Sequence, residues 1–189
     1  MSKKIVLKNV RLRYEHVFTP SAFDDSQEAK YSATVIIPKD HPDLPAAKRA
    51  MMEAGKESFP SDFGGNGWPK GYTCSLRDAD VAVDSSGVVL AEKDPTLKGS
   101  YIIDANSTRR PLVIDRNKHA VAEEDGLIYA GSFVNVSMNA AGYTFGKVKK
   151  GVKCYLNGVQ HVAPGERFGV DVSDDFDALD GDSDDDIFM

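Results

Sequence analysis

The sequence contains few residues of the kinds that cross-link a chain or bind metals. Only two of its 189 residues are cysteines, Cys74 and Cys154, and each lies in a segment that alternates like a strand. In a chain without an export signal, this pattern is typical of reduced, structural thiols and disfavours a disulfide framework. The four histidines are scattered without the spacing of metal ligands: His16, His41, His119 and His161. We therefore expect neither a metal nor another cofactor.

Long apolar segments are also missing. No stretch approaches the roughly 18 consecutive apolar residues that a membrane-spanning helix needs, and residues 1–8 lack the apolar core of a secretory signal. Apolar residues make up 41% of the chain and charged residues 28%, which is typical of globular proteins rather than disordered or fibrous ones. We expect a cytoplasmic protein without membrane contact, long enough to build one good core.

The acidic residues are concentrated at one end of the chain. The whole sequence has 23 Lys and Arg against 29 Asp and Glu, but residues 171–189 hold nine of these acids, all aspartate, and no basic residue. Residues 1–170 therefore carry 23 basic against 20 acidic side chains, a net charge of +3. A segment so rich in charge cannot bury enough apolar surface to offset its chain entropy. We expect one mildly basic domain over 1–170 and a disordered acidic tail over 171–189.

The tip of this tail combines acids with apolar side chains. An acidic string that ends near an aromatic ring favours a docking peptide, because the acids steer it to a basic surface and the ring fills an apolar pocket. A tail that only improves solubility is the alternative. Calcium binding is disfavoured, although aspartates alternate over 180–184, because Asp185 stands where an EF-hand loop needs glycine. The predicted docking residues are Asp184, Asp185, Asp186, Ile187 and Phe188.

The domain is predicted to be mainly β. Period-two alternation and short apolar runs between turn formers predict strands near residues 10–14, 31–37, 71–78, 100–104, 111–115, 127–130, 132–140, 143–148 and 152–160. One helix is predicted over 44–58, with Pro45 in its first turn and Asp43 as its cap. Ala141 and Gly142 are predicted to form a hairpin turn. Many short strands with a single helix indicate a closed or nearly closed antiparallel barrel.

Motifs of catalysis are scarce. The glycine-rich segment 63–68 lacks the Gly-Lys-Ser/Thr ending of a phosphate-binding loop, and no serine lies in a nucleophile-elbow sequence. We therefore do not expect an enzyme. A metal-dependent nuclease stays open as an alternative, because carboxylates that are scattered in the sequence can converge in space.

Aromatic and basic residues alternate near the end of the domain. If 143–148 and 152–156 are strands, their rings and lysines share outward faces, and further lysines line the turn between them. Rings that stack on any base and ammonium groups that follow phosphates are the combination that a single-stranded nucleic acid needs. In the alternative interpretation, the ring at 143 or the ring at 145 belongs to the core and the lysines are ordinary solvated turn charges. The candidate contacts are Tyr143, Phe145, Lys147, Lys149, Lys150, Lys153 and Tyr155.

Two weaker groups of candidates lie elsewhere in the chain. Trp68, Lys70 and Tyr72 put the single tryptophan beside a lysine in a loop, where it can stack on a base or else cover one end of the barrel. Arg109 and Arg110 precede the apolar run 112–114 and can line the same groove.

Taken together, these features resemble bacteriophage single-stranded DNA-binding proteins. The resemblance is carried by the basic, strand-rich body, by the aspartate-rich tail, and most specifically by the segment 142–162, GYTFGKVKKGVKCYLNGVQHV. It implies a five-stranded OB-fold barrel that coats single-stranded DNA during phage replication, recombination and repair. It also implies a tail that contacts replisome proteins such as the polymerase and the helicase-primase. In that family the aromatic residue typically ends the tail, whereas here Met189 follows Phe188.

The resulting hypothesis is a sequence-independent binder of single-stranded DNA whose tail competes with DNA for a basic groove. The same tail can also link two copies into a homodimer, which the sequence leaves open. The alternative from another class is a phage structural or adaptor protein, whose tail docks a capsid or chaperone partner. Because the body carries only +3, tight DNA binding has to come from local clustering of charge.

Overall fold

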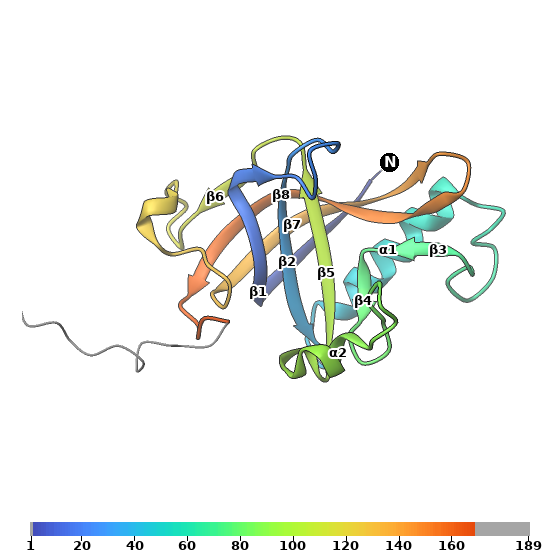
Figure 1. The fold of residues 1–189 in the computed structure, drawn as a ribbon, viewed down its shortest axis with the longest axis horizontal. Coiled ribbons are helices and arrows are strands. Elements are labelled where there is room, and N and C mark those ends of the chain that lie inside the picture. Colours follow the sequence, from blue (N-terminus) through green and yellow to red (C-terminus); the bar gives the residue numbers. More distant parts are fainter. Residues whose placement is uncertain (1, 169–189) are drawn as a thin grey trace, which may run out of the picture.

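The computed structural model describes residues 2–168, which fold around one β-barrel (Figure 1). The strands are β1 (Lys3–Ser21), β2 (Lys30–Pro38), β3 (Tyr72–Cys74), β4 (Leu76–Asp78), β5 (Ser100–Ser107), β6 (Leu112–Ile114), β7 (Phe133–Phe145) and β8 (Lys149–Ala163). The helical segments are α1 (Leu44–Ser58), α2 (Leu90–Lys93), and two 3-10 turns, η1 (Pro95–Leu97) and η2 (Glu123–Asp125). The acidic tail predicted for 171–189, with its disorder and its docking tip, lies outside the described residues.

Five strands close the barrel, in the order β1, β2, β5, β8, β7 and back to β1. The closing pair β5–β8 is parallel and consists of Ala105 opposite Cys154 and Asn106 opposite Tyr155, whereas the other four pairs are antiparallel. β3 and β6 pair in parallel with β8, and β4 pairs with β5. The mainly β, five-stranded OB-fold barrel with additional strands is thus confirmed, but the expectation of an antiparallel barrel was wrong at the closing pair.

The predicted helix over 44–58 is confirmed as α1. Its buried side, which includes Ala47, Met51 and Ala54, packs against β1, β7 and β8. Asp43 occupies the N-cap position, but its carboxylate accepts a hydrogen bond from the Lys8 amide (2.9 Å) instead of capping the helix. The prediction of a single helix was incomplete, because α2 adds one further turn.

The predicted hairpin turn at Ala141 and Gly142 was wrong. β7 runs without interruption to Phe145, and the turn to β8 lies at 146–148, where Gly146 has a φ of 62°. Gly142 is required for another reason, because a Cβ atom at this position would lie 2.3 Å from the Ser58 side chain at the end of α1. The long β7–β8 hairpin therefore extends from the barrel beside α1 and β3, as Figure 1 shows.

Two other predicted strands differ from the structure. Residues 127–130 form no strand, because the Tyr129 hydroxyl donates a hydrogen bond to the Gly165 carbonyl and its amide donates to the Ser132 hydroxyl. The predicted strand 71–78 is divided at Ser75 into β3, which pairs with β8, and β4, which pairs with β5.

Both cysteines are unpaired, as expected for structural thiols. Cys154 is fully buried, with its sulfur 3.5 Å from the sulfur of Met51. Burial raises the pKa of the Cys74 thiol to about 11 and that of Cys154 to about 12. Both thiols therefore stay protonated at neutral pH.

Among residues 2–168, no helix is long and apolar enough to cross a lipid bilayer. Over the same residues, no three His, Cys, Asp or Glu side chains gather as metal ligands would.

Candidate nucleic-acid interface

A groove of about 1100 Å³ lies between the β1–β2 connection and the β7–β8 hairpin. In Figure 1 the connection is the blue loop above the barrel, and the hairpin is the orange pair of strands that extends beyond it. The ends of β2 and β5 and the middle of β8 also line the groove. Its lining residues are Ser21, Ala22, Phe23, Ser26, Gln27, Glu28, Lys30, Ser32, Asn106, Gly142, Tyr143, Thr144, Phe145, Lys149, Lys153 and Tyr155.

The register of the hairpin places the candidate rings and two of the lysines on one face. Residues directly opposite each other in antiparallel strands share a face of the sheet. The opposite pairs here are Phe145 and Lys149, Tyr143 and Gly151, Ala141 and Lys153, and Asn139 and Tyr155. Val152, Cys154 and Leu156 alternate with these positions and are buried, so the predicted outward direction of Lys153 and Tyr155 is confirmed.

The rings on this face are accessible to a ligand. Phe145 is 75% exposed and Tyr155 is 38% exposed, so the alternative that placed Phe145 in the core is wrong. Tyr143 is partly covered, and its hydroxyl lies 2.6 Å from that of Thr73. Exposed rings at fixed positions on a strand provide a stacking surface for unpaired bases.

The groove is electropositive. Lys30, Lys149 and Lys153 line it, with Glu28 as the single carboxylate among its lining residues. The Lys153 ammonium lies 5.2 Å from the centre of the Tyr143 ring and 4.9 Å from that of Tyr155, which places a cation between two stacking surfaces. Within residues 2–168, no ion pair involves any of the three lysines.

A smaller hollow of about 330 Å³ continues this surface toward Arg109. Lys30, Asn106, Lys153 and Tyr155 line both spaces. Arg110 is exposed but lines neither of them. The structure therefore brings Arg109 to the candidate site and leaves Arg110 outside it.

Two predicted lysines are not on the groove face. Lys150 projects from the opposite face of the hairpin, with its ammonium 5.8 Å from the centre of the Phe59 ring. Lys147 lies in the turn rather than on a strand with Tyr143 and Phe145, because β7 ends before it. The predicted shared face was therefore wrong for Lys147.

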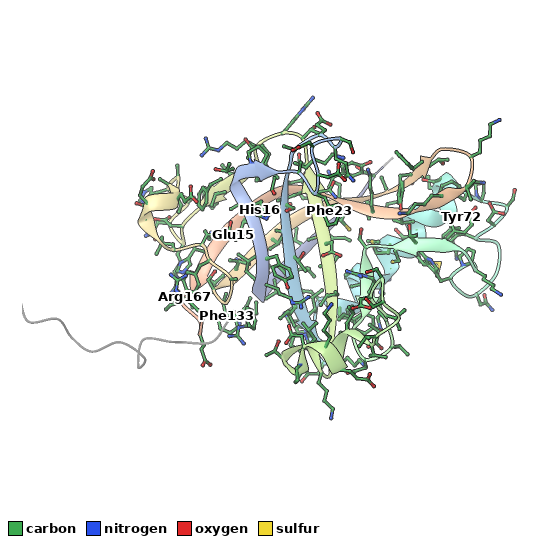
Figure 2. All side chains as sticks on the ribbon, in the orientation of Figure 1. Glu15, His16, Phe23, Tyr72, Phe133 and Arg167 are labelled. Atoms are coloured by element: carbon green, nitrogen blue, oxygen red, sulfur yellow. The ribbon has the colours of Figure 1, made fainter. Side chains whose placement is uncertain are left out.

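Trp68, Lys70 and Tyr72 do not line the groove. Tyr72 lies on β3 opposite Lys150 of the hairpin, and Figure 2 shows it at the right of the molecule, with the groove residue Phe23 nearer the centre. The Trp68 ring packs edge-on against Phe63 with centroids 5.1 Å apart, and its indole N–H donates to the Tyr72 carbonyl. Tyr72 also packs on Phe63, and its hydroxyl donates to the Asp62 carboxylate. Of the two interpretations of Trp68, this packing favours a structural cover over a platform for a base.

The sequence reasoning missed several groove residues. Phe23 lies in the β1–β2 connection and is 94% exposed. The sequence feature that could have indicated it is a bulky ring among turn-forming aspartates and serines. Lys30 and Ser32 belong to β2, whose sequence signal comes from its apolar residues. Asn106 had no sequence signal, because only the closing β5–β8 pair brings it beside Tyr155.

Comparison with known proteins gives consistent matches over nearly the whole chain. The model of the protein family described as "Enterobacter phage Enc34, ssDNA-binding protein" matches residues 3–188. The putative protein p50 of Acyrthosiphon pisum secondary endosymbiont phage 1 is 32% identical over 187 residues, which cover 93% of this chain and 94% of that protein.

Solved structures of proteins from two phages have the same fold. The single-stranded DNA-binding protein from bacteriophage Enc34, in complex with ssDNA, matches with a TM-score of 0.72 and 23% identity over 88% of this chain and 90% of that one. Another structure of that protein matches with a TM-score of 0.67 and 25% identity, over 93% and 90% of the two chains. The single-stranded DNA binding protein gp2.5 of bacteriophage T7 matches with a TM-score of 0.59 and 15% identity, over 94% and 98%.

Proposed function

The chain belongs to the family of the Enterobacter phage Enc34 ssDNA-binding protein, and on this premise we propose that it binds single-stranded DNA, without catalysis and without a required sequence. The observation that carries the proposal is the groove of about 1100 Å³. In it, exposed rings lie together on the hairpin face with lysines that form no ion pair within residues 2–168, opposite the β1–β2 connection. In OB-folds, the loops between strands 1 and 2 and between strands 4 and 5 flank the surface that binds oligonucleotides. The β1–β2 connection and the turn at 146–148 occupy these places.

Each part of the groove has a separate role in this proposal. Phe145, Tyr155 and Tyr143 on the hairpin, with Phe23 on the opposite side of the groove, stack on unpaired bases. Lys30, Lys149, Lys153 and Arg109 contact phosphates. In a duplex the bases are paired and covered by their neighbours, so only a single strand can use the rings. Of the other sequence candidates, Lys70, Arg110, Lys147 and Lys150 are proposed as outer phosphate contacts.

The biological role that we propose is the coating of single-stranded DNA during phage replication, recombination and repair in the host cell. Stacking and phosphate contacts do not depend on sequence, which suits a protein that must cover any exposed strand. The tail would recruit replisome proteins, including the polymerase and the helicase-primase, to the coated DNA.

Titration of a labelled oligo(dT) with the protein over a series of salt concentrations tests the binding proposal. The logarithm of the affinity should fall linearly with that of the salt concentration, with a slope of about −0.7 per neutralised phosphate. The double variant Lys149→Ala/Lys153→Ala should make this slope shallower by about 1.4. Its matched control is Lys4→Ala/Lys8→Ala, two exposed lysines outside the groove, which should leave the slope unchanged.

The same titration separates the alternatives. An adaptor protein would bind no oligonucleotide at any salt concentration, and a general polyanion binder would be displaced equally well by duplex competitor. A nuclease would shorten the labelled strand when magnesium is added. Any of these results would contradict the proposal.

Deletion of residues 171–189 should raise the affinity for oligo(dT), most clearly at low salt. Nine tethered aspartates near a basic groove compete with DNA at an effective concentration in the millimolar range. A variant with all nine aspartates changed to asparagine separates charge from length, and it should bind DNA as tightly as the truncated chain. Unchanged affinity in both variants would exclude the competition. Light scattering on the truncated chain would show whether the tail also links two copies.

A further inference from the structure

A second hollow of about 450 Å³ opens beside the groove. Of its lining residues, only Tyr143 and Lys153 have a role in the function proposed above. It shares Asn106, Tyr143 and Lys153 with the groove, so a strand bound there passes its entrance. Its volume is within the range of about 300–1,000 Å³ that is typical of small-molecule sites. The lining residues are Thr73, Cys74, Ser75, Arg77, Asp104, Asn106, Tyr143, Val152 and Lys153.

An ion pair lies in the wall of this hollow. The guanidinium of Arg77 on β4 donates to one oxygen of the Asp104 carboxylate on β5 at 2.6 Å. The Thr34 hydroxyl on β2 donates to the other oxygen, also at 2.6 Å. The Arg77 and Asp104 side chains are 38% and 41% exposed, so both keep hydrogen-bonding capacity toward the hollow. Three strands thus hold a carboxylate and a guanidinium side by side.

This arrangement suits a base better than a phosphate. A fixed carboxylate repels a phosphate and leaves oxygen lone pairs for N–H donors. The Tyr143 ring lines the same hollow and is held in place by its hydroxyl contact with Thr73, so it offers a surface for stacking. A base on this ring would direct its polar edge toward an acceptor and a donor that lie next to each other.

Guanine complements this pair most fully. Its Watson–Crick edge presents the O6 acceptor next to the N1–H and N2–H donors, so Arg77 can donate to O6 while Asp104 accepts from the two donors. Thymine presents one N–H between two carbonyl oxygens, which the carboxylate would repel. We propose that the hollow formed around Tyr143, Arg77 and Asp104 is a base pocket that prefers guanine at one position of the bound strand. This inference rests on the proposed function and adds a modest preference to sequence-independent binding.

The test compares oligo(dT) with an otherwise identical strand that carries isolated guanines at every fourth position, and with a third strand that carries inosine at those positions. The protein should bind the guanine strand about fivefold more tightly than oligo(dT). Inosine lacks the N2 amino group, so the inosine strand should fall between the two. Equal affinity for all three strands would overturn the base pocket while leaving the proposed function intact. Binding to none of them would instead refute the proposed function.

The variant Asp104→Asn assigns the preference to the carboxylate. It should bind oligo(dT) more tightly, because a negative charge is removed, and it should lose the preference for guanine. Glu28→Gln is the matched control, because Glu28 lines the groove but not the hollow. It should bind all strands more tightly and keep the preference. A guanine preference that persists in Asp104→Asn would overturn the role of Asp104.

Discussion

Replacing Phe145 and Tyr155 together by alanine should weaken the binding of oligo(dT) by about 30-fold or more. Stacking of a base on an aromatic side chain contributes about 1–3 kcal/mol per base, and the two exposed rings lie on the same face of the hairpin. The slope of affinity against salt should stay nearly unchanged, because no phosphate contact is removed. Fluorescence anisotropy of a labelled strand measures both quantities.

The matched control for this variant is Tyr14→Ala. Tyr14 is 58% exposed on β1 but does not line the groove, so its removal should not change DNA affinity. If the double variant binds oligo(dT) as tightly as the natural chain, base stacking on this face is excluded. The lysines alone would then have to account for the affinity.

Phe63→Ala should lower the free energy of unfolding by about 3–5 kcal/mol, the usual cost of removing a large buried ring. Phe63 is 1% exposed and packs edge-on against Trp68 and Tyr72. It also fits against Gly55 of α1, where an added Cβ atom would lie 2.3 Å from the ring. Urea denaturation followed by circular dichroism measures the change.

Phe23→Ala gives the matched comparison, because this ring is 94% exposed. Its removal should change the free energy of unfolding by no more than about 0.5 kcal/mol. If both variants unfold at the same urea concentration, the aromatic cluster of Phe59, Phe63, Trp68 and Tyr72 does not stabilise the domain.

The elements that could be predicted from the sequence are those whose signal is local. The helix over 44–58 has a proline in its first turn and an apolar stripe, and both features are visible within 15 residues. The alternation at the start of β8 showed that Lys153 and Tyr155 point outward, because a strand reverses its faces at every residue. For the same reason, the burial of Val152 and Cys154 could be predicted together with them.

The parts of the site that could not be predicted depend on contacts between distant segments. Glycine is common in turns, but at position 142 the absence of a side chain is needed because Ser58 lies so close. A turn at Ala141 and Gly142 would leave Lys147 on the following strand. In the structure the turn begins at Gly146, so Lys147 lies within it. Asp104 and Arg77 are unremarkable in the sequence, and they meet only because β4 pairs with β5.

The β5–β8 pair that closes the barrel also bears on how small a DNA-binding fragment could be. Asn106 reaches Tyr155 only through the parallel contact of β5 with β8, which joins segments about 50 positions apart in the chain. A peptide that contained the hairpin alone would carry its rings and lysines but would lack the groove residues that β2 and β5 contribute. Bringing such remote segments together costs loop-closure entropy. In the folded protein this cost has been offset by formation of the whole barrel. We therefore expect DNA binding through the groove to require the complete barrel, and a short segment taken from it should not bind.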